Sequence, residues 1–187
     1  MSLYIGEAGI GRPAEARSAV EERCYELLDA LGVRYVRVDH EHADTIAACE
    51  EVESVLGCRI CKNLFLTNRQ QTDFYLLVMP GEKPFKTKLL SRQIGTARLS
   101  FAGAEDMERL LGVTPGSVSV LGLMNDTEKR VRLLIDRDVL HEENFGCHPC
   151  RNTTSLRFAT AELTEKLLPA LGHEPTLVEL PWVVPEE

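Results

Sequence analysis

The segment Phe74–Met79, which reads Phe-Tyr-Leu-Leu-Val-Met, constrains the fold more than any other part of the sequence. All of its residues are apolar or aromatic, so a strand formed here presents hydrophobic side chains on both faces. Strands of this kind lie inside sheets that are covered on both sides. We therefore expect a central strand within a covered sheet.

Helix and strand patterns alternate around this segment and predict a single α+β domain over residues 1–187. We expect residues 1–14 to be an N-terminal extension. Residues 173–187 are expected to form an extended tail that packs through Leu177, Leu180 and Trp182. Apolar periodicity predicts helices over residues 13–31, 45–56, 86–94, 104–111 and 161–171. It predicts strands over residues 35–39, 63–67, 118–124, 130–136 and 154–158, with 118–124 and 130–136 joined as a hairpin.

The net charge of −8 hides a basic segment. Residues 59–98 carry eight basic and two acidic side chains, a local charge of +6, and the rest of the chain carries −14. An acidic body argues against a protein that coats nucleic acid without specificity. The basic segment is either a solvated face or a localised anion site.

The sequence also bears on compartment and cysteine chemistry. No apolar run approaches the roughly 20 residues that span a bilayer, and the N-terminus lacks the basic and apolar regions of a secretory signal. We therefore expect a cytoplasmic protein with reduced cysteines and no membrane partner. Cys58 and Cys61 form one C-x-x-C pair, and Cys147 and Cys150 form another. A closed zinc site, redox thiols and small residues that line a pocket all remain open as interpretations.

Lysines at two places could contact an anionic substrate. Lys62 and Asn63 open the predicted strand 63–67, where a fixed ammonium could lie over a phosphate or a carbonyl oxygen. Lys86 and Lys88 flank Thr87 at a predicted helix start, which suits phosphate contacts but is also common on surfaces.

Two loops could carry chemistry. The turn Pro115-Gly-Ser-Val-Ser119 offers successive backbone N–H groups that could hold a carboxylate or an oxyanion. His148 lies close in sequence to Asn152 and Thr153, and could act as a general base or be structural.

Several short segments, taken in order, carry a family resemblance. They are His42-Ala-Asp-Thr45; Cys61-Lys-Asn-Leu-Phe-Leu66; Phe74-Tyr-Leu-Leu77; Lys86-Thr-Lys88; Arg98-Leu-Ser-Phe-Ala102; Pro115-Gly-Ser-Val-Ser119 with Leu121-Gly-Leu123 and Asn125-Asp126; and Gly146-Cys-His-Pro149 with Asn152-Thr153. Together they resemble the editing-domain family associated with prolyl-tRNA synthetase, over about residues 20–171. Many members carry a Gly-x-x-x-Pro loop, where this chain has Gly116 and Val120.

The resemblance implies a mixed, partly barrel-like sheet surrounded by helices. It also implies an ester hydrolase that acts on the 3′ end of charged tRNA and removes alanine wrongly attached to proline tRNA, with no cofactor and no DNA partner. The alternatives are a non-catalytic module that binds an amino acid or charged tRNA, and a zinc-stabilised interaction domain. Either a monomer or a homodimer is compatible with the sequence. We expect catalytic roles for Lys62, Gly116, Ser117, Val118 and His148, and substrate contacts from His42, Thr45, Asn63, Lys86, Lys88, Ser100, Asn152 and Thr153.

Overall fold

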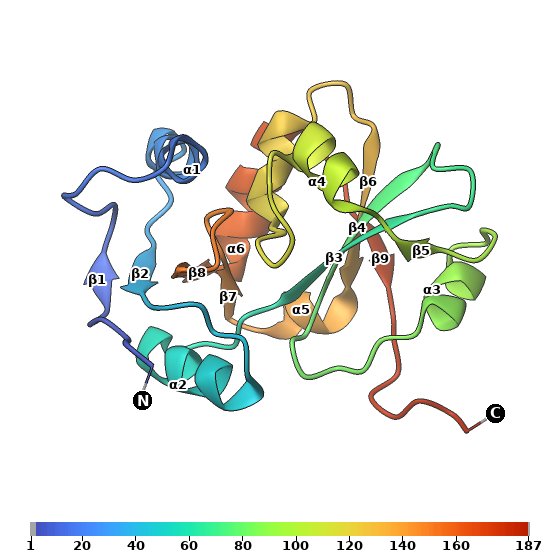
Figure 1. Cartoon of the computed structure of the whole chain (residues 1–187), viewed down its shortest axis with the longest axis horizontal. Helices are drawn as coiled ribbons and strands as arrows, with labels where there is room; N and C mark the ends of the chain where they lie inside the picture. Colours follow the sequence, from blue (N-terminus) through green and yellow to red (C-terminus); the bar gives the residue numbers. More distant parts are fainter. Residues whose placement is uncertain (1–2, 187) are drawn as a thin grey trace.

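The computed structural model describes residues 3–186 and consists of two β-sheets flanked by helices (Figure 1). The larger sheet has the strand order β5-β3-β4-β6-β9. Because β4 pairs antiparallel with β3 and parallel with β6, the sheet is mixed. Every residue of β4 is buried, which confirms the predicted central strand. The strands are β3 (Lys62–Thr67), β4 (Phe74–Met79), β5 (Ser100–Phe101), β6 (Val131–Asp136) and β9 (Thr176–Val178).

Hydrophobic side chains cover both faces of this sheet. Phe65 and Leu76 belong to the larger hydrophobic cluster, while their chain neighbours Leu66 and Leu77 belong to a smaller one that includes Leu90. This alternation is the period-two pattern of a strand, applied to a sheet with two buried faces. Burying each such side chain contributes roughly 1.5–3 kcal/mol. The α+β fold class with a mixed sheet and surrounding helices is confirmed.

The smaller sheet is antiparallel, in the order β1-β2-β8-β7. A bridge between Ile60 and Gly146 connects it to the chain that then enters β3. An ideal Cβ on Gly146 would lie 2.5 Å from the carbonyl oxygen of Arg59, so this close approach requires glycine. The bridge thereby fixes the point at which Lys62 begins β3. The strands are β1 (Gly9–Ile10), β2 (Val36–Asp39), β7 (Asn144–Cys147) and β8 (Thr154–Ala159).

The helices lie around the sheets, with α1 and α3 towards opposite ends of the molecule (Figure 1). Thr45 caps α2 by accepting a hydrogen bond from the N–H of Ala48, and Gly57 ends it with φ +80°, so the helix agrees with the predicted range 45–56 to within one residue. The first helix begins at Ala19, later than the predicted start at residue 13, and residues 13–18 are not helical. The helices are α1 (Ala19–Ala30), α2 (Ile46–Leu56), α3 (Thr87–Gln93), α4 (Ala104–Leu111), α5 (Arg137–His141), α6 (Thr160–Glu162) and α7 (Leu168–Leu171), with a π-helical segment η2 (Leu163–Leu167) between the last two.

The predicted strand 118–124 is wrong, and so is the hairpin built on it. The chain forms a 3-10 helix, η1 (Val120–Asn125), because the Ser119 hydroxyl accepts a hydrogen bond from the N–H of Leu121 and turns the backbone. Gly122 packs tightly against α4, where a Cβ would lie 3.0 Å from the carbonyl oxygen of Leu111. The apolar pattern of this segment therefore serves helix packing.

Both terminal segments contribute strands. β1 pairs with β2, and β9 adds a parallel edge to β6. The packing predicted for the tail is only partly correct. Leu180 is buried, but Leu177 is 40% exposed and Trp182 is 53% exposed. The residue that β9 buries instead is Val178, because strand residues alternate between faces.

Candidate functional site

Four of the predicted site residues converge on one cavity of about 620 Å³ beside α2. Thr45 comes from the cap of α2, Lys62 from the start of β3, and His148 and Asn152 from the loop between β7 and β8. His40, which directly follows β2, lines the same cavity. The cavity thus brings together side chains that are more than 100 residues apart in the sequence.

A second hollow of about 320 Å³ adjoins this cavity, because Cys61 and His148 line both. Asn63 of β3 lines it too, together with Gly116 and Val118 of the turn that follows α4. The His148 ring therefore lies where the lysine side of the site meets the turn that carries the predicted oxyanion donors.

The hydrogen bonds of His148 define its tautomer. Its Nδ1 lies 2.8 Å from the carbonyl oxygen of Thr154 and must carry the proton. Burial lowers the pKa of His148 to about 4, so the ring is neutral at physiological pH and Nε2 is an acceptor. Ser155 adds a second contact, with Oγ 3.3 Å from Nδ1.

His40 belongs to the same hydrogen-bond network. Its Nδ1 donates to the carbonyl oxygen of Glu41 at 2.7 Å, so its Nε2 accepts from the Ser155 hydroxyl at 2.8 Å. Burial also lowers the pKa of His40. Ser155 therefore links two neutral imidazoles, and this chain of bonds fixes the orientation of the His148 ring.

Lys62 is held at the cavity by a backbone contact. Its Nζ donates to the carbonyl oxygen of Lys83 at 2.5 Å, and burial lowers the pKa of Lys62. Lys83 is itself fixed, because its ammonium lies 2.8 Å from carboxylate oxygens of both Asp136 and Asp138. Since an ammonium has three donors, Lys62 retains donors for a ligand in the cavity.

The turn that carries the predicted oxyanion donors is a type II turn with Gly116 at φ +86°. The Ser117 N–H closes the turn by donating to the carbonyl oxygen of Thr114 at 3.0 Å, so it is not available to a ligand. The Ser117 hydroxyl is used as well, since it accepts from the Asn152 N–H at 3.3 Å. In the part of the chain that the structure describes, the N–H groups of Gly116 and Val118 have no hydrogen-bond partner.

Asn63 is anchored on both sides of its amide. Oδ1 accepts from the N–H of Val120 at 3.0 Å, and Nδ2 donates to the carbonyl oxygen of Cys61 at 3.2 Å. The first bond depends on the departure from the family pattern, because a proline at position 120 has no N–H. In this chain Asn63 therefore ties β3 to the loop that begins at Gly116.

The remaining predicted substrate contacts lie outside both hollows. His42 and Ser100 are both exposed and line neither hollow. The carbonyl oxygen of Thr153 accepts a hydrogen bond from the N–H of His40. Lys86 and Lys88 line a separate groove beside α3. His40 was not predicted from the sequence, although it follows Val38 at the two-residue spacing of a strand and is buried on the same side.

The cysteine pairs come close together without forming a metal site. Among residues 3–186, no three His, Cys, Asp or Glu side chains are placed to hold a metal ion. Cys150 instead contacts Cys24, with 3.7 Å between the sulfur atoms. Burial raises the pKa of Cys58 to about 11 and that of Cys61 to about 12, so both remain protonated thiols at neutral pH.

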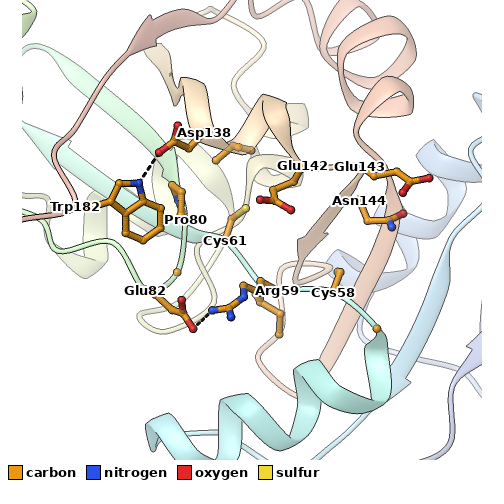
Figure 2. Close-up of a pocket in the computed structure, with 14 residues that line it drawn as sticks. Cys58, Arg59, Cys61, Pro80, Glu82, Asp138, Glu142, Glu143, Asn144 and Trp182 are labelled. Atoms are coloured by element: carbon orange, nitrogen blue, oxygen red, sulfur yellow. Dashed lines mark hydrogen bonds and ion pairs between the residues drawn. The ribbon is translucent and has the colours of Figure 1, made fainter.

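Cys58 and Cys61 also line a third hollow of about 470 Å³ (Figure 2), which His148 does not line. Carboxylates dominate it, and Arg59 pairs with Glu82 across its rim. Trp182 closes one side and donates its indole N–H to Asp138 at 2.8 Å. The predicted catalytic residues do not line this hollow.

Comparison with known proteins bears directly on this geometry. The model of the aminoacyl-tRNA editing domain matches residues 40–166, which include all the residues of the two hollows that share His148. The chain belongs to the aminoacyl-tRNA editing domain family.

Relatives of this editing domain match it over most of their length. The prolyl-tRNA editing protein ProX of Acetoanaerobium sticklandii is 29% identical over 153 residues, covering 82% of this chain and 93% of that protein. The prolyl-tRNA synthetase associated domain-containing protein 1 of Danio rerio is 28% identical, covering 93% of this chain and 94% of that protein. The solved structure of a candidate trans-editing enzyme for prolyl tRNA synthetase superposes with a TM-score of 0.66 at 18% identity, covering 89% of this chain and 100% of the other, which shows a shared fold. No helix within residues 3–186 of the editing domain is long and apolar enough to cross a bilayer.

Proposed function

We propose that the protein is a cytoplasmic trans-editing deacylase that hydrolyses the ester of misacylated tRNA, with alanyl-tRNA(Pro) as its substrate. Membership of the editing family and similarity to a prolyl-tRNA editing protein support this proposal. The observation that carries it is the position of His148, a neutral imidazole that lines both the cavity with Lys62 and the hollow with Gly116 and Val118. A water, a phosphate-bearing terminus and an ester carbonyl each find a suitable partner there.

In the proposed reaction a water attacks the ester carbonyl carbon. The oxyanion that forms is stabilised by the N–H groups of Gly116 and Val118, each worth roughly 3–4 kcal/mol. His148 accepts a hydrogen bond from the water and orients it, because a group with a pKa of about 4 is too weak a base to hold the proton. The C–O bond then breaks, and the proton passes to the leaving ribose oxygen with help from the neighbouring hydroxyl.

Lys62 and Asn63 position the substrate in this mechanism. The Lys62 ammonium, tethered to the Lys83 carbonyl, contacts the phosphate of the terminal nucleotide or the ester oxygen. Asn63 holds the loop that presents the oxyanion donors. Alanine is selected because a small pocket excludes the larger proline, since attraction of one methylene adds only about 1–3 kcal/mol of discrimination.

The test is single-turnover deacylation of alanyl-tRNA(Pro) by the parent protein and by Lys62→Ala. We expect Lys62→Ala to lower the rate constant at least tenfold. Lys166→Ala is the matched control, since it removes a lysine that pairs with Glu162 on the surface away from both hollows and should keep the parent rate. Tight binding of alanyl-tRNA(Pro) without hydrolysis by the parent would identify a binding module instead, and full activity in Lys62→Ala would refute the role of this lysine.

A further inference from the structure

A basic groove lies beside α3 and is separate from the cavity that holds Lys62. It has a volume of about 860 Å³ and is lined by four exposed cations, Lys86, Lys88, Arg92 and Arg98, together with polar side chains and two phenylalanines. No Asp or Glu is among the described residues that line it. Half of the basic side chains of the +6 segment are thus gathered on one surface.

The groove reaches the candidate active site through one aromatic residue. Phe101 lines both the groove and the hollow that contains His148. It lies on the edge strand β5, where pairing with β3 places it opposite Leu66, and its side chain is 59% exposed. Phe85 holds the ring from the side in a T-shaped contact, with 6.0 Å between the ring centroids. An exposed ring supported in this way offers a flat face to a ligand.

Charge and shape together indicate the class of ligand. The chain outside residues 59–98 carries a net charge of −14 and repels a polyanion. The groove, with its four cations, attracts one. An acidic protein segment would satisfy the cations but has no use for the exposed ring. Single-stranded nucleic acid uses both features, because its phosphates follow basic grooves while its bases stack on aromatic side chains.

We propose that the basic groove binds the unpaired 3′-terminal segment of an RNA. Phosphates contact Arg92, Arg98 and Lys86, and one base stacks on Phe101. The terminal nucleotide then enters the hollow beside His148. This inference rests on the proposed function and deepens it, by assigning the path along which the RNA end reaches the site.

The experiment measures binding of an uncharged stem-loop RNA with a four-nucleotide unpaired 3′ end, and of the same stem with a blunt end, by fluorescence anisotropy at several salt concentrations. We expect the double variant Arg92→Ala/Arg98→Ala to weaken binding of the unpaired RNA at least tenfold. The slope of log affinity against log salt should also fall by roughly 1.4, the value for two phosphate contacts to a single strand. The matched control is Arg34→Ala/Arg130→Ala, which removes the same charge from exposed residues that do not line the groove.

Phe101→Ala isolates the stacking contact. We expect it to weaken binding of the unpaired RNA by about five- to a hundredfold, as loss of one stacked base does, with an unchanged salt slope and no effect on the blunt stem. Parent-like binding by the Arg92→Ala/Arg98→Ala variant would overturn the proposal, and so would an equal loss in the control pair. Equal weakening of both RNAs by Phe101→Ala would overturn the single-strand assignment. Because this RNA carries no amino acid, its binding does not depend on ester hydrolysis. A parent protein that binds it but hydrolyses no aminoacyl ester would contradict the proposed function and leave the groove assignment standing.

Discussion

Replacing Val120 with proline restores the family pattern at this position and removes one specific hydrogen bond. Val120 is the first residue of η1, where proline is favoured because its missing N–H has no partner within the helix. The preceding Ser119 has φ −148° and ψ 148°, the extended conformation that a residue before proline requires. The backbone therefore accommodates Val120→Pro, and the main loss is the 3.0 Å bond to Asn63 Oδ1.

The size of the effect follows from that bond. A hydrogen bond of this type contributes about 1 kcal/mol net to the free energy of unfolding. Proline returns about 0.4–1 kcal/mol by restricting the unfolded chain. Since changes to the Val120 side chain add to the total, the bond itself is best measured as a coupling energy in a double-mutant cycle with Asn63→Ala.

Urea unfolding of the parent, Val120→Pro, Asn63→Ala and the double variant gives this coupling. We expect about 1 kcal/mol, because Val120→Pro has no bond left to break once Asn63 is alanine. Val120→Ala is the control, since it shortens the side chain but keeps the N–H, and its coupling to Asn63→Ala should be near zero. Equal destabilisation by Val120→Pro in both backgrounds would refute the argument that this N–H anchors Asn63.

Three further predictions concern stability. An ideal Cβ on Gly81 lies 2.5 Å from a backbone carbonyl oxygen, so Gly81→Ala should lower the free energy of unfolding by about 1–3 kcal/mol. The control is Gly9→Ala, whose Cβ has its nearest contact at 3.9 Å and which should cost less than half of that. Equal losses of unfolding free energy in urea for the two variants would contradict the packing at Gly81. Lys83→Met leaves the fully buried carboxylate of Asp136 without its cation and should cost about 3–5 kcal/mol, and a loss below 1 kcal/mol would be inconsistent with a buried ion pair. Burial lowers the pKa of His148 to about 4, against about 6.5 in the unfolded chain, so the unfolded state binds the proton first as pH falls. The free energy of unfolding should therefore fall by up to about 3 kcal/mol between pH 6.5 and pH 4. His148→Gln should remove this pH dependence, and an unchanged pH profile in this variant would count against the buried neutral ring.

Local sequence signals predict much of this fold because the forces involved are local. Thr45 and Gly57 bound α2 by short-range hydrogen bonding and glycine conformation, and the helix occupies nearly the range 45–56 predicted from the sequence. The apolar residues of β4 require burial on both faces wherever the strand is placed. In contrast, the apolar run after Ser119 fits either a strand or a helix, and the contact of Gly122 with Leu111 favours the helix.

The site shows the same division. Lys62 lies at the larger cavity and His148 at both hollows because their motifs sit at the ends of strands that the fold brings together. The role of His40 depends on its bond to Ser155, 115 residues away, which no local pattern encodes. Likewise the Ser117 N–H, expected to face a substrate, is consumed by its own turn.

The most direct test of the central claim compares the rates at which the parent protein deacylates alanyl-tRNA(Pro) and prolyl-tRNA(Pro) in single turnover. The account predicts hydrolysis of the alanyl ester at least tenfold faster than that of the prolyl ester, because the proposed selectivity comes from steric exclusion of the larger residue. Absence of hydrolysis of either ester, or equal rates for both, would contradict it.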